Sequence, residues 1–442
     1  MSFPKTPRTH CALQGAVSVA SAIEGVIPVV HSTSGCALQG YLAGSLANGA
    51  AGTGPLGGWS VPSTNVTEKH VIFGGPSRLR EQIKNTVKVV EGKLYLVISG
   101  CAPTLVGDDS AAMAKEINDQ GWSTASVQAS GLHGNAYSGY QLVFRSLVEK
   151  LAPEGSAPLP QETGLVNLLG VVPGQDSLWE GDLHHLGDAL AKAGLIPNRL
   201  FGSGQTLKNW ERIPAAEVNA VVSPWGLEIA EYLKERFGTP FVRWDHFPVG
   251  PGDTTRWLLE VAAAIGAPEE RVHLAAEEAE KSFGYFLRRF SDAYFNLDFQ
   301  TGFSVVGPVA QAVGISRFLD RELGFHSDAV VGTDHSPLPV TAVEELLGGT
   351  VGGTIVALTE NRLEIESILR RATSGLVLAS SHEATIAETS GAAHLSISFP
   401  VTDRLLLRRG YAGYAGALNL LEDVGTTLLL RRRRRSEGNP RT

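Results

Sequence analysis

Short runs of apolar residues recur along the chain, and most end at glycine or a small polar residue before a segment with helical periodicity. The runs at 26–31 and 94–99 are the clearest, because apolar residues fill nearly all of their positions. Continuous apolar runs of this length are typical of parallel strands, whose two faces are both covered by helices. Further strands are predicted at 164–170, 218–222, 240–243, 303–307, 328–332, 353–357 and 376–380.

Amphipathic segments alternate with these runs. Repeated strand–turn–helix units predict parallel sheets joined by right-handed crossovers. The predicted fold class is therefore α/β, with three Rossmann-like domains whose parallel sheets are flanked by helices. Helices are predicted before the first strand, from Thr64, at 78–90, 110–119, 140–151, 183–193, 227–237, 256–298 and 309–323, and through 428–430 near the C-terminus.

Two segments lack enough large side chains for a fixed local shape. Residues 153–160 are rich in Pro, Gly and Ser and predict the first domain boundary. Residues 43–58 are rich in Gly and Ala and predict a flexible loop or a segment ordered by a partner chain. The predicted domains are an N-terminal α/β domain at 1–160, a second Rossmann-like domain at 161–298, and a third at 299–442 that includes the C-terminal helix.

Composition narrows the class of protein. With 442 residues, of which 43% are hydrophobic and 19% charged, the chain is long enough for two or three domains, and 50 glycines indicate many tight turns. A net charge of −8 argues against a general nucleic-acid or anionic-membrane surface. No run reaches the roughly 20 apolar residues that span a bilayer, and no signal segment follows Met1. We expect a cytoplasmic protein, whose thiols stay reduced.

The three cysteines all lie in the first quarter of the chain, at Cys11, Cys36 and Cys101. A lone buried cysteine is usually a small hydrophobic residue, and the odd number without a CxxC motif indicates neither a disulfide framework nor a zinc knuckle. Each, however, lies beside glycine or in a turn, and Cys101 follows the predicted strand at 94–99. Ligands of open α/β sheets bind at the carboxyl ends of strands, so the three thiols are candidate metal ligands.

Other polar motifs favour structural roles. The histidines lack paired metal-ligand spacing, and Asp108-Asp109 precedes a predicted helix, where both carboxylates are interpreted as helix caps. The run from Arg431 to Arg435 is interpreted as the solvated end of the last helix. The chain has no GxxxxGK[ST] motif, so a nucleotide would have to act on another protein. We therefore assign no catalytic residue.

Six ordered landmarks together resemble a known family, the nitrogenase component 1 superfamily, over nearly the whole chain. That resemblance implies a subunit of an α2β2 iron–sulfur oxidoreductase built from two related chains. The landmarks are Cys11 with Gly15; His31 with Gly35-Cys36; Thr67-Glu68 before Gly74-Gly75; Cys101 with Gly107-Asp108-Asp109; Phe399-Pro400 with Asp403-Arg404; and 413–417.

The resemblance implies a cofactor and partners. Cys11, Cys36 and Cys101 would ligate this chain's share of an [8Fe-7S] P-type cluster, or alternatively a [4Fe-4S] cluster, at the interface with a homologous α subunit. No cysteine follows Cys101, which resembles the β-type subunit that does not hold the active-site metallocofactor. Two features depart from the β pattern: the 65-residue gap between Cys36 and Cys101 is closer to the α-type spacing, and Ser130 is adjacent to the place of a cluster-assisting serine near Gly131.

The function implied is electron relay from an ATP-dependent iron–sulfur reductase protein to a metallocofactor in the α subunit. A methylthio-alkane reductase β subunit, cleaving C–S bonds reductively, is the favoured expectation. A nitrogenase β subunit reducing N2 and a cofactor-assembly scaffold are the alternatives within the family. Outside it, the alternative is a sugar- or nucleotide-binding α/β protein with incidental cysteines. Neither a nucleic-acid nor a membrane partner is expected.

Overall fold

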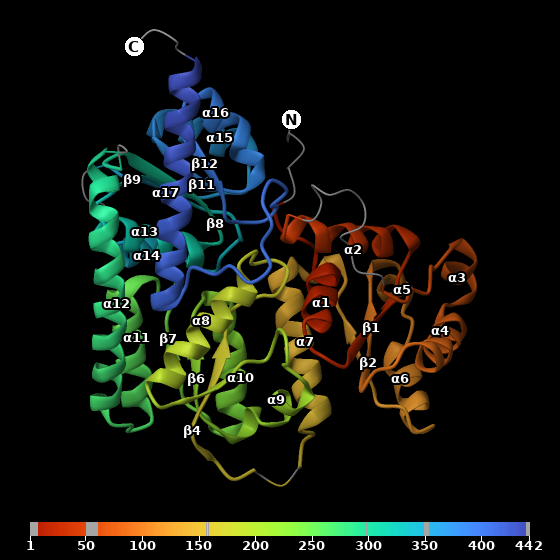
Figure 1. Ribbon diagram of the computed structural model, residues 1–442. Helices are drawn as coiled ribbons and strands as arrows, with labels where there is room; N and C mark the ends of the chain where they lie inside the picture. The colour runs from red at the N-terminus through yellow and green to blue at the C-terminus, as the bar shows by residue number, and fades with distance from the viewer. Residues whose placement is uncertain are drawn as a thin grey trace.

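The computed structural model describes residues 8–49, 61–155, 157, 159–296, 299–348 and 353–438. Three separate sheets, in each of which every strand pair is parallel, follow one another along the chain (Figure 1). Their strand orders are β1-β2-β3, β5-β4-β6-β7 and β10-β9-β8-β11-β12. The predicted α/β class with parallel sheets flanked by helices is confirmed.

The strands are β1 (Val26–His31), β2 (Leu94–Ser99), β3 (Thr124–Gln128), β4 (Glu162–Leu169), β5 (Ile196–Asn198), β6 (Ala216–Val221), β7 (Phe241–Arg243), β8 (Gly302–Gly307), β9 (His326–Gly332), β10 (Ile355–Leu358), β11 (Leu376–Ala379) and β12 (Ala393–Ser396). Each sheet falls within one of the three predicted domain ranges. The domain boundaries themselves stay a prediction.

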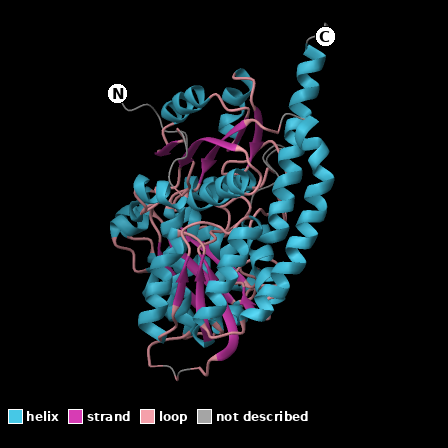
Figure 2. Cartoon of the chain, turned by 90° about the vertical axis from the view of Figure 1, so that its left-hand side faces the viewer, coloured by secondary structure: helices cyan, strands magenta, loops and turns pink. Residues whose placement is uncertain are grey.

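The α-helices are α1 (Ala12–Ser21), α2 (Ser34–Ala47), α3 (Glu68–Phe73), α4 (Pro76–Val89), α5 (Cys101–Val106), α6 (Ser110–Asn118), α7 (Ala136–Leu151), α8 (Trp179–Lys192), α9 (Leu207–Glu211), α10 (Leu227–Phe237), α11 (Gly250–Ala264), α12 (Glu269–Asn296), α13 (Val309–Arg321), α14 (Val340–Leu346), α15 (Arg362–Ala372), α16 (Ala384–Thr389) and α17 (Gly413–Gly438). Short 3-10 turns include η3 (Gly131–His133) and η6 (Ser381–Glu383). The long helices α11, α12 and α17 pack on one another along one side of the molecule (Figures 1 and 2).

One apolar core runs through all three sheets. Its buried residues extend from α1 through β4 and β6 to the C-terminal helix α17. Because burial of apolar surface is the main favourable term in folding, the three units stabilise one another rather than standing alone. Within the described part of the chain, no helix is long and apolar enough to cross a membrane.

Two glycines bring α1 and α7 into backbone contact. A Cβ at Gly15 would overlap the backbone of Ala136, and a Cβ at Gly139 would overlap the backbone of Ala12. The absent side chains therefore allow the two helices to approach closely. This contact fixes the start of α1, where Cys11 lies.

Several predicted elements differ from the structure. Residues 43–47, predicted as loop, belong to α2, and the rest of the predicted loop lies mostly outside the described residues. Cys36, expected on a turn, lies in the first turn of that helix. The helical region predicted at 256–298 is two helices, α11 and α12, separated where Gly266 adopts a positive φ and Pro268 follows. The helix predicted from residue 140 already begins at Ala136, because the side chain of Asn135 caps it.

Candidate functional site

Each of the three cysteines lies at the start of a helix. Cys11 is the N-cap residue of α1, Cys36 lies in the first turn of α2, and Cys101 is the first residue of α5. The first N–H groups of a helix lack intrahelical partners, and their partial positive charge favours thiolate over thiol. All three cysteines are free of disulfide bonds and partly exposed.

The sheet places Cys101 as the sequence predicts, immediately after the carboxyl end of β2, the central strand of the first sheet. The linking residue, Gly100, has no room for a side chain, because a Cβ there would overlap the side chain of Ser32. Ser32 follows β1 and precedes the helix that carries Cys36. The two neighbouring strands therefore deliver two cysteines to the same edge of the sheet.

A backbone turn at Gly131 joins two of the cysteines. The Gly131 N–H donates a hydrogen bond of 3.2 Å to Cys101 Sγ. A Cβ built on Gly131 would lie 3.5 Å from Cys101 Sγ and 3.6 Å from Cys11 Cβ. Cys11 and Cys101, 90 residues apart in the sequence, thus flank one glycine.

Cys36 belongs to the same group of thiols. The pKa of Cys11 is raised above its ordinary value, mainly by burial and further by the charges of Cys36 and Cys101, while the N–H groups of Gln14 and Leu13 oppose the rise. The helices α1 and α2 are also joined directly, because Gln14 Nε2 donates a hydrogen bond of 2.8 Å to the Cys36 carbonyl.

This donor set suits a cluster of several metal ions better than a single ion. Among the described residues, no three His, Cys, Asp or Glu side chains converge as ligands of one metal ion. In an iron–sulfur cluster each protein thiolate binds a different iron atom, so the sulfurs need not converge on one point. Two soft thiols beside a glycine, with a third on the adjoining helix α2, fit such a group.

A buried network holds the turns that carry Cys36 and Cys101. His31, the last residue of β1, lies 3.1 Å from Thr64 Oγ1 through Nδ1 and 3.1 Å from Asp108 Oδ2 through Nε2. Asp108 Oδ1 also accepts a hydrogen bond of 3.0 Å from the Gly75 N–H. Burial is the main reason why the pKa of His31 is lowered, and the nearby Asp108 opposes that shift. The structural interpretation of this histidine is confirmed.

The two neighbouring aspartates have different roles. Asp109 caps α6, since its Oδ1 accepts a hydrogen bond of 2.9 Å from the Ala112 N–H, as predicted. The cap interpretation of Asp108 is wrong, because its carboxylate turns inward to His31 and Gly75 instead. Two hydrogen-bond partners in the interior stabilise the Asp108 carboxylate more than a single helix-cap bond would.

Asn135 anchors the N-terminal side of the group. It pairs with Cys11 in an antiparallel bridge, and the Ala12 N–H donates a hydrogen bond of 3.0 Å to the Gly134 carbonyl. Its side chain caps α7 and also donates a hydrogen bond of 3.3 Å to the Asp334 carbonyl of the third sheet. Sequence reasoning missed Asn135 and Gly131 as site residues. The sequence did offer one signal for Asn135: an Asn is a typical N-cap residue, and it lies four residues before Gly139, the glycine of α7 that contacts α1.

A second cavity, of about 600 Å³, lies where the three sheets meet, and its lining includes Cys11, Asn135 and Trp225. The Trp225 ring stacks on Tyr137 with 4.6 Å between ring centroids. Trp225 Nε1 donates a hydrogen bond of 2.8 Å to Asp334 Oδ2. Side chains that could ligate a metal also line this cavity, among them His10, His335 and Glu360, and His335 Nε2 lies 2.9 Å from Glu360 Oε2.

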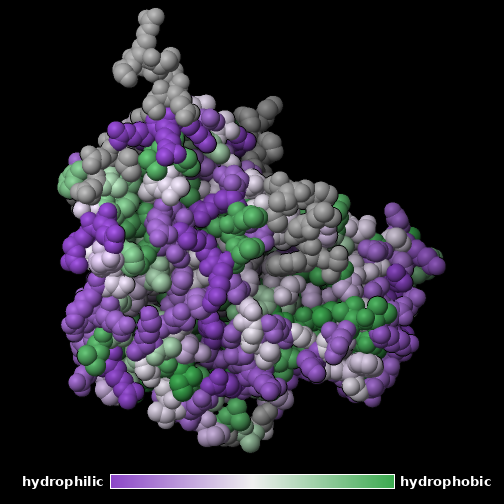
Figure 3. All heavy atoms as spheres, viewed as in Figure 1, coloured by the Kyte–Doolittle hydropathy of each residue, from purple (hydrophilic) through white to green (hydrophobic). Residues whose placement is uncertain are grey.

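Exposed apolar side chains surround the cysteines on the same short elements. Helix α5 exposes Leu105 beside Cys101, and η3 exposes Leu132 beside Gly131. The face seen in Figure 3 is mostly hydrophilic, with apolar side chains in separate patches. Clustered apolar exposure near a candidate cofactor site is typical of a protein interface. We name this surface the apolar rim; it consists of Val71, Ile72, Phe73, Leu105, Val106 and Leu132.

Fold and site together define an α/β chain of the oxidoreductase type, built on three parallel sheets. A sequence model described as Nitrogenase component 1 type Oxidoreductase matches residues 11–429, so the chain belongs to this family. The resemblance seen in the sequence is thereby confirmed at the level of the family.

Relatives of several kinds share this similarity. The nitrogenase iron-molybdenum cofactor biosynthesis protein NifE of Clostridium pasteurianum is 24% identical, over 95% of this chain and 87% of that protein. The nitrogenase molybdenum-iron protein alpha chain of Methanothermobacter marburgensis is 26% identical, over 94% and 86% respectively. The beta chain of Frankia alni is 23% identical, over 96% and 82%. The solved structure "Nitrogenase Cp1 at pH 6.5" shares the fold, with a TM-score of 0.80 at 16% identity, covering 98% of this chain and 95% of that one.

Proposed function

We propose that this chain is a β-type subunit of a nitrogenase-like iron–sulfur reductase. Cys11, Cys36 and Cys101 ligate its share of an [8Fe-7S] P-type cluster, with a [4Fe-4S] cluster as the alternative. The observation that carries the proposal is the grouping of two of these thiols around Gly131, with the third on α2, which Gln14 of α1 joins through its hydrogen bond to the Cys36 carbonyl. A homologous α subunit supplies the remaining ligands across the apolar rim, in an α2β2 heterotetramer.

The residues of this chain would bind the cluster and hold its cysteine ligands in position. Cys11, Cys36 and Cys101 each lie at the start of a helix, where the first backbone N–H groups lack intrahelical partners. The Gly131 N–H donates to Cys101 Sγ, and such N–H···S bonds tune the potential of an iron–sulfur group. When bound, the cluster accepts and passes on single electrons. The network of His31 keeps the cysteine-bearing turns in place during this exchange.

The assignment as a β-type chain rests on the sequence after Cys101. No cysteine follows Cys101, so this chain offers no later thiolate to a metallocofactor. The substrate-reducing metallocofactor therefore belongs to the α subunit. Electrons come from a separate ATP-dependent iron–sulfur reductase protein, because this chain has no GxxxxGK[ST] motif. The favoured reaction is reductive C–S cleavage of methylthio-alkanes, and N2 reduction is the alternative.

A cofactor-assembly scaffold is the second candidate function. It is favoured by the 24% identity to the cofactor biosynthesis protein of C. pasteurianum. The two functions differ in what the purified complex does. A scaffold releases its metal group to an acceptor protein and does not turn over substrate, whereas a reductase keeps its cluster and reduces substrate.

The proposal is tested by anaerobic co-purification with the partner chain, followed by iron analysis, redox spectroscopy and assays with small thioethers and dinitrogen. Cys101→Ala is expected to lower the iron content and abolish the spectroscopic signal of the interface cluster. The matched control is Ala102→Ser, which changes the adjacent, equally half-buried position without removing a thiol. Unchanged iron content and spectra in Cys101→Ala would show that the ligand assignment is wrong.

A further inference from the structure

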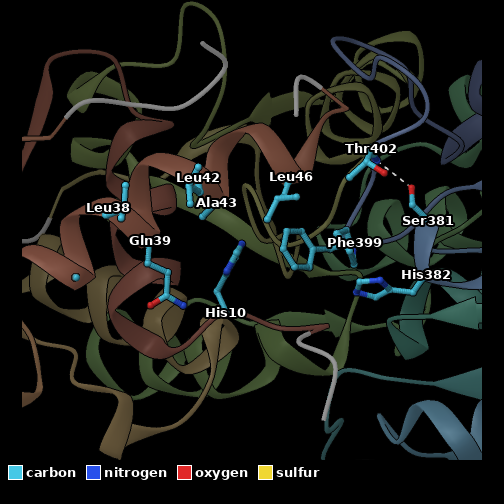
Figure 4. Close-up of a pocket in the computed structure, with 12 residues that line it drawn as sticks. His10, Leu38, Gln39, Leu42, Ala43, Leu46, Ser381, His382, Phe399 and Thr402 are labelled. Atoms are coloured by element: carbon cyan, nitrogen blue, oxygen red, sulfur yellow. Dashed lines mark hydrogen bonds between the residues drawn. The ribbon is translucent and has the colours of Figure 1, made fainter. Parts of the chain in front are cut away.

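A cavity next to the cysteine group lies between α2 and the loop that follows β12 (Figure 4). Its lining includes His10 and Gly35, the residues before Cys11 and Cys36, but no cysteine among the described residues. Its volume is about 460 Å³, within the range of small-molecule sites. One wall is the face of α2 that carries Leu38, Leu42 and Leu46, and the opposite wall includes Phe399 and Thr402. Leu38 and Leu42 are 61% and 43% exposed, so the cavity opens to solvent beside them.

Among the described residues, the lining of this cavity is mostly apolar and includes no Lys, Arg, Asp or Glu; its polar members include Gln39 and His382. A charged ligand would lose its hydration there without gaining a counter-ion. One polar wall group is already in use, because Ser381 Oγ accepts a hydrogen bond of 2.9 Å from the Thr402 N–H and donates one of 2.8 Å to Asp403. The chemistry of the walls therefore selects an uncharged molecule.

His10 gives the cavity one polar anchor. Its side chain lines the cavity and, although the residue is only 7% exposed, its Nε2 atom has no hydrogen-bond partner within the described chain. Buried polar atoms are nearly always paired, so an unpaired one indicates a missing partner.

The ring of His10 is held in this position from both sides. Its backbone N–H donates a hydrogen bond of 3.0 Å to Gln175 Oε1, and its carbonyl accepts one of 2.7 Å from the Ala136 N–H. The ring packs against Phe399 with 4.3 Å between ring centroids (Figure 4). A partner for Nε2 must therefore come to the ring.

We propose that this cavity binds an uncharged, compact and mainly apolar molecule through one hydrogen-bonding group, which pairs with His10 Nε2. The site adjoins the cysteines without including their side chains, and its occupant goes beyond the proposed electron relay. The neutral imidazole can donate or accept at this atom, so a hydroxyl group, which does both, is the suitable probe.

The test is calorimetric titration of the purified complex with three probes of one shape: 4-methylphenol, p-xylene and 4-methylbenzoate. We expect 4-methylphenol to bind about fivefold more tightly than p-xylene, the worth of one neutral hydrogen bond, and 4-methylbenzoate to bind at least about tenfold more weakly. His10→Phe keeps a ring against Phe399 and is expected to remove the preference for 4-methylphenol over p-xylene.

A second variant protects the test against a folding defect. Leu42→Trp adds bulk at the exposed mouth and is expected to weaken all uncharged probes, whereas Leu274→Trp, at a 61% exposed position of α12, leaves their affinities unchanged. Equal affinities for 4-methylphenol and p-xylene, full binding to Leu42→Trp, or no binding of any probe would overturn the proposal. Iron content is measured on the same samples, so failure of the cavity proposal is distinguishable from failure of the cluster assignment.

Discussion

The buried Asp108 is expected to contribute far more to stability than its neighbour Asp109, although both precede the same helix. Asp108 is 7% exposed, accepts a hydrogen bond of 3.0 Å from the Gly75 N–H and lies 3.1 Å from His31 Nε2. Asp108→Ala leaves both of these groups unpaired in the interior. At about 1–3 kcal/mol for each unpaired buried group, the free energy of unfolding should fall by about 2–6 kcal/mol.

Asp109→Ala is the matched control, because it removes only the N-cap bond to the Ala112 N–H, worth about 1 kcal/mol. Both variants are compared by denaturant unfolding and by hydrogen exchange of the peptide that contains Gly75. Asp108→Ala should lower the unfolding midpoint more and accelerate exchange at Gly75, whereas Asp109→Ala should leave that exchange unchanged. An equal or greater loss of stability in Asp109→Ala, or unaltered exchange at Gly75 in Asp108→Ala, refutes the reasoning.

Three further predictions concern packing, pH and assembly. Gly139→Ala places a Cβ against the backbone of α1 and should lower the free energy of unfolding by about 1–3 kcal/mol or more. Gly284→Ala, in open space on α12, should raise it by about 0.5–1 kcal/mol. Denaturant unfolding measures both. Burial raises the pKa of Asp182 to about 7, so its folded form binds the proton more tightly than the unfolded chain, and the resulting stability is lost as the pH rises through 7. Asp182→Asn should therefore flatten the stability profile between about pH 4 and pH 7; a profile of unchanged slope there contradicts this. Phe73→Asp, at an 80% exposed position of the apolar rim, should prevent assembly with the partner while leaving the fold intact, and Leu274→Asp should not; light scattering of the co-expressed chains decides.

Burial explains which strands the sequence predicts. The runs predicted at 26–31 and 94–99 match β1 and β2, because nearly every residue of both strands is buried. The strands that sequence reasoning missed are β3, β5 and β12, and all three are edge strands. β3 contains Thr124, Ser126 and Gln128, so its pattern is that of a polar loop until pairing with β2 fixes it. Such pairing is a long-range property, absent from any local window.

Helix α2 was missed for a related reason. Its sequence is dominated by Gly, Ala and Ser, which give no amphipathic period, so local preference does not predict a helix. What stabilises it is tertiary contact. Gly40 lies so close to the Gln14 side chain that a Cβ there would stand 2.7 Å from Gln14 Oε1, and Gln14 bonds the Cys36 carbonyl. The small residues are needed for close packing, not for flexibility.

Some features of the candidate site could likewise be predicted from the sequence, and others could not. The place of Cys101 at the end of β2 follows from the sequence, because the carboxyl end of a strand is fixed by the strand itself. The nearness of Gly131 to Cys101 and Cys11 does not, since it depends on how β3 and α7 return the chain to that edge. The inward turn of Asp108 was equally hidden, because its partner His31 lies 77 residues earlier.

The raised pKa of Cys11 bears on how such a site comes to be filled. Burial and the charges of Cys36 and Cys101 both oppose its ionisation, so the fold alone does not keep three thiolates together. Positive charge from iron removes that opposition, and metal binding then releases protons. The backbone contacts at Gly131 and Gly15, by contrast, need no metal. On the proposed function, the fold therefore supplies the geometry in advance, and the iron and the partner chain supply the charge balance that the thiols lack.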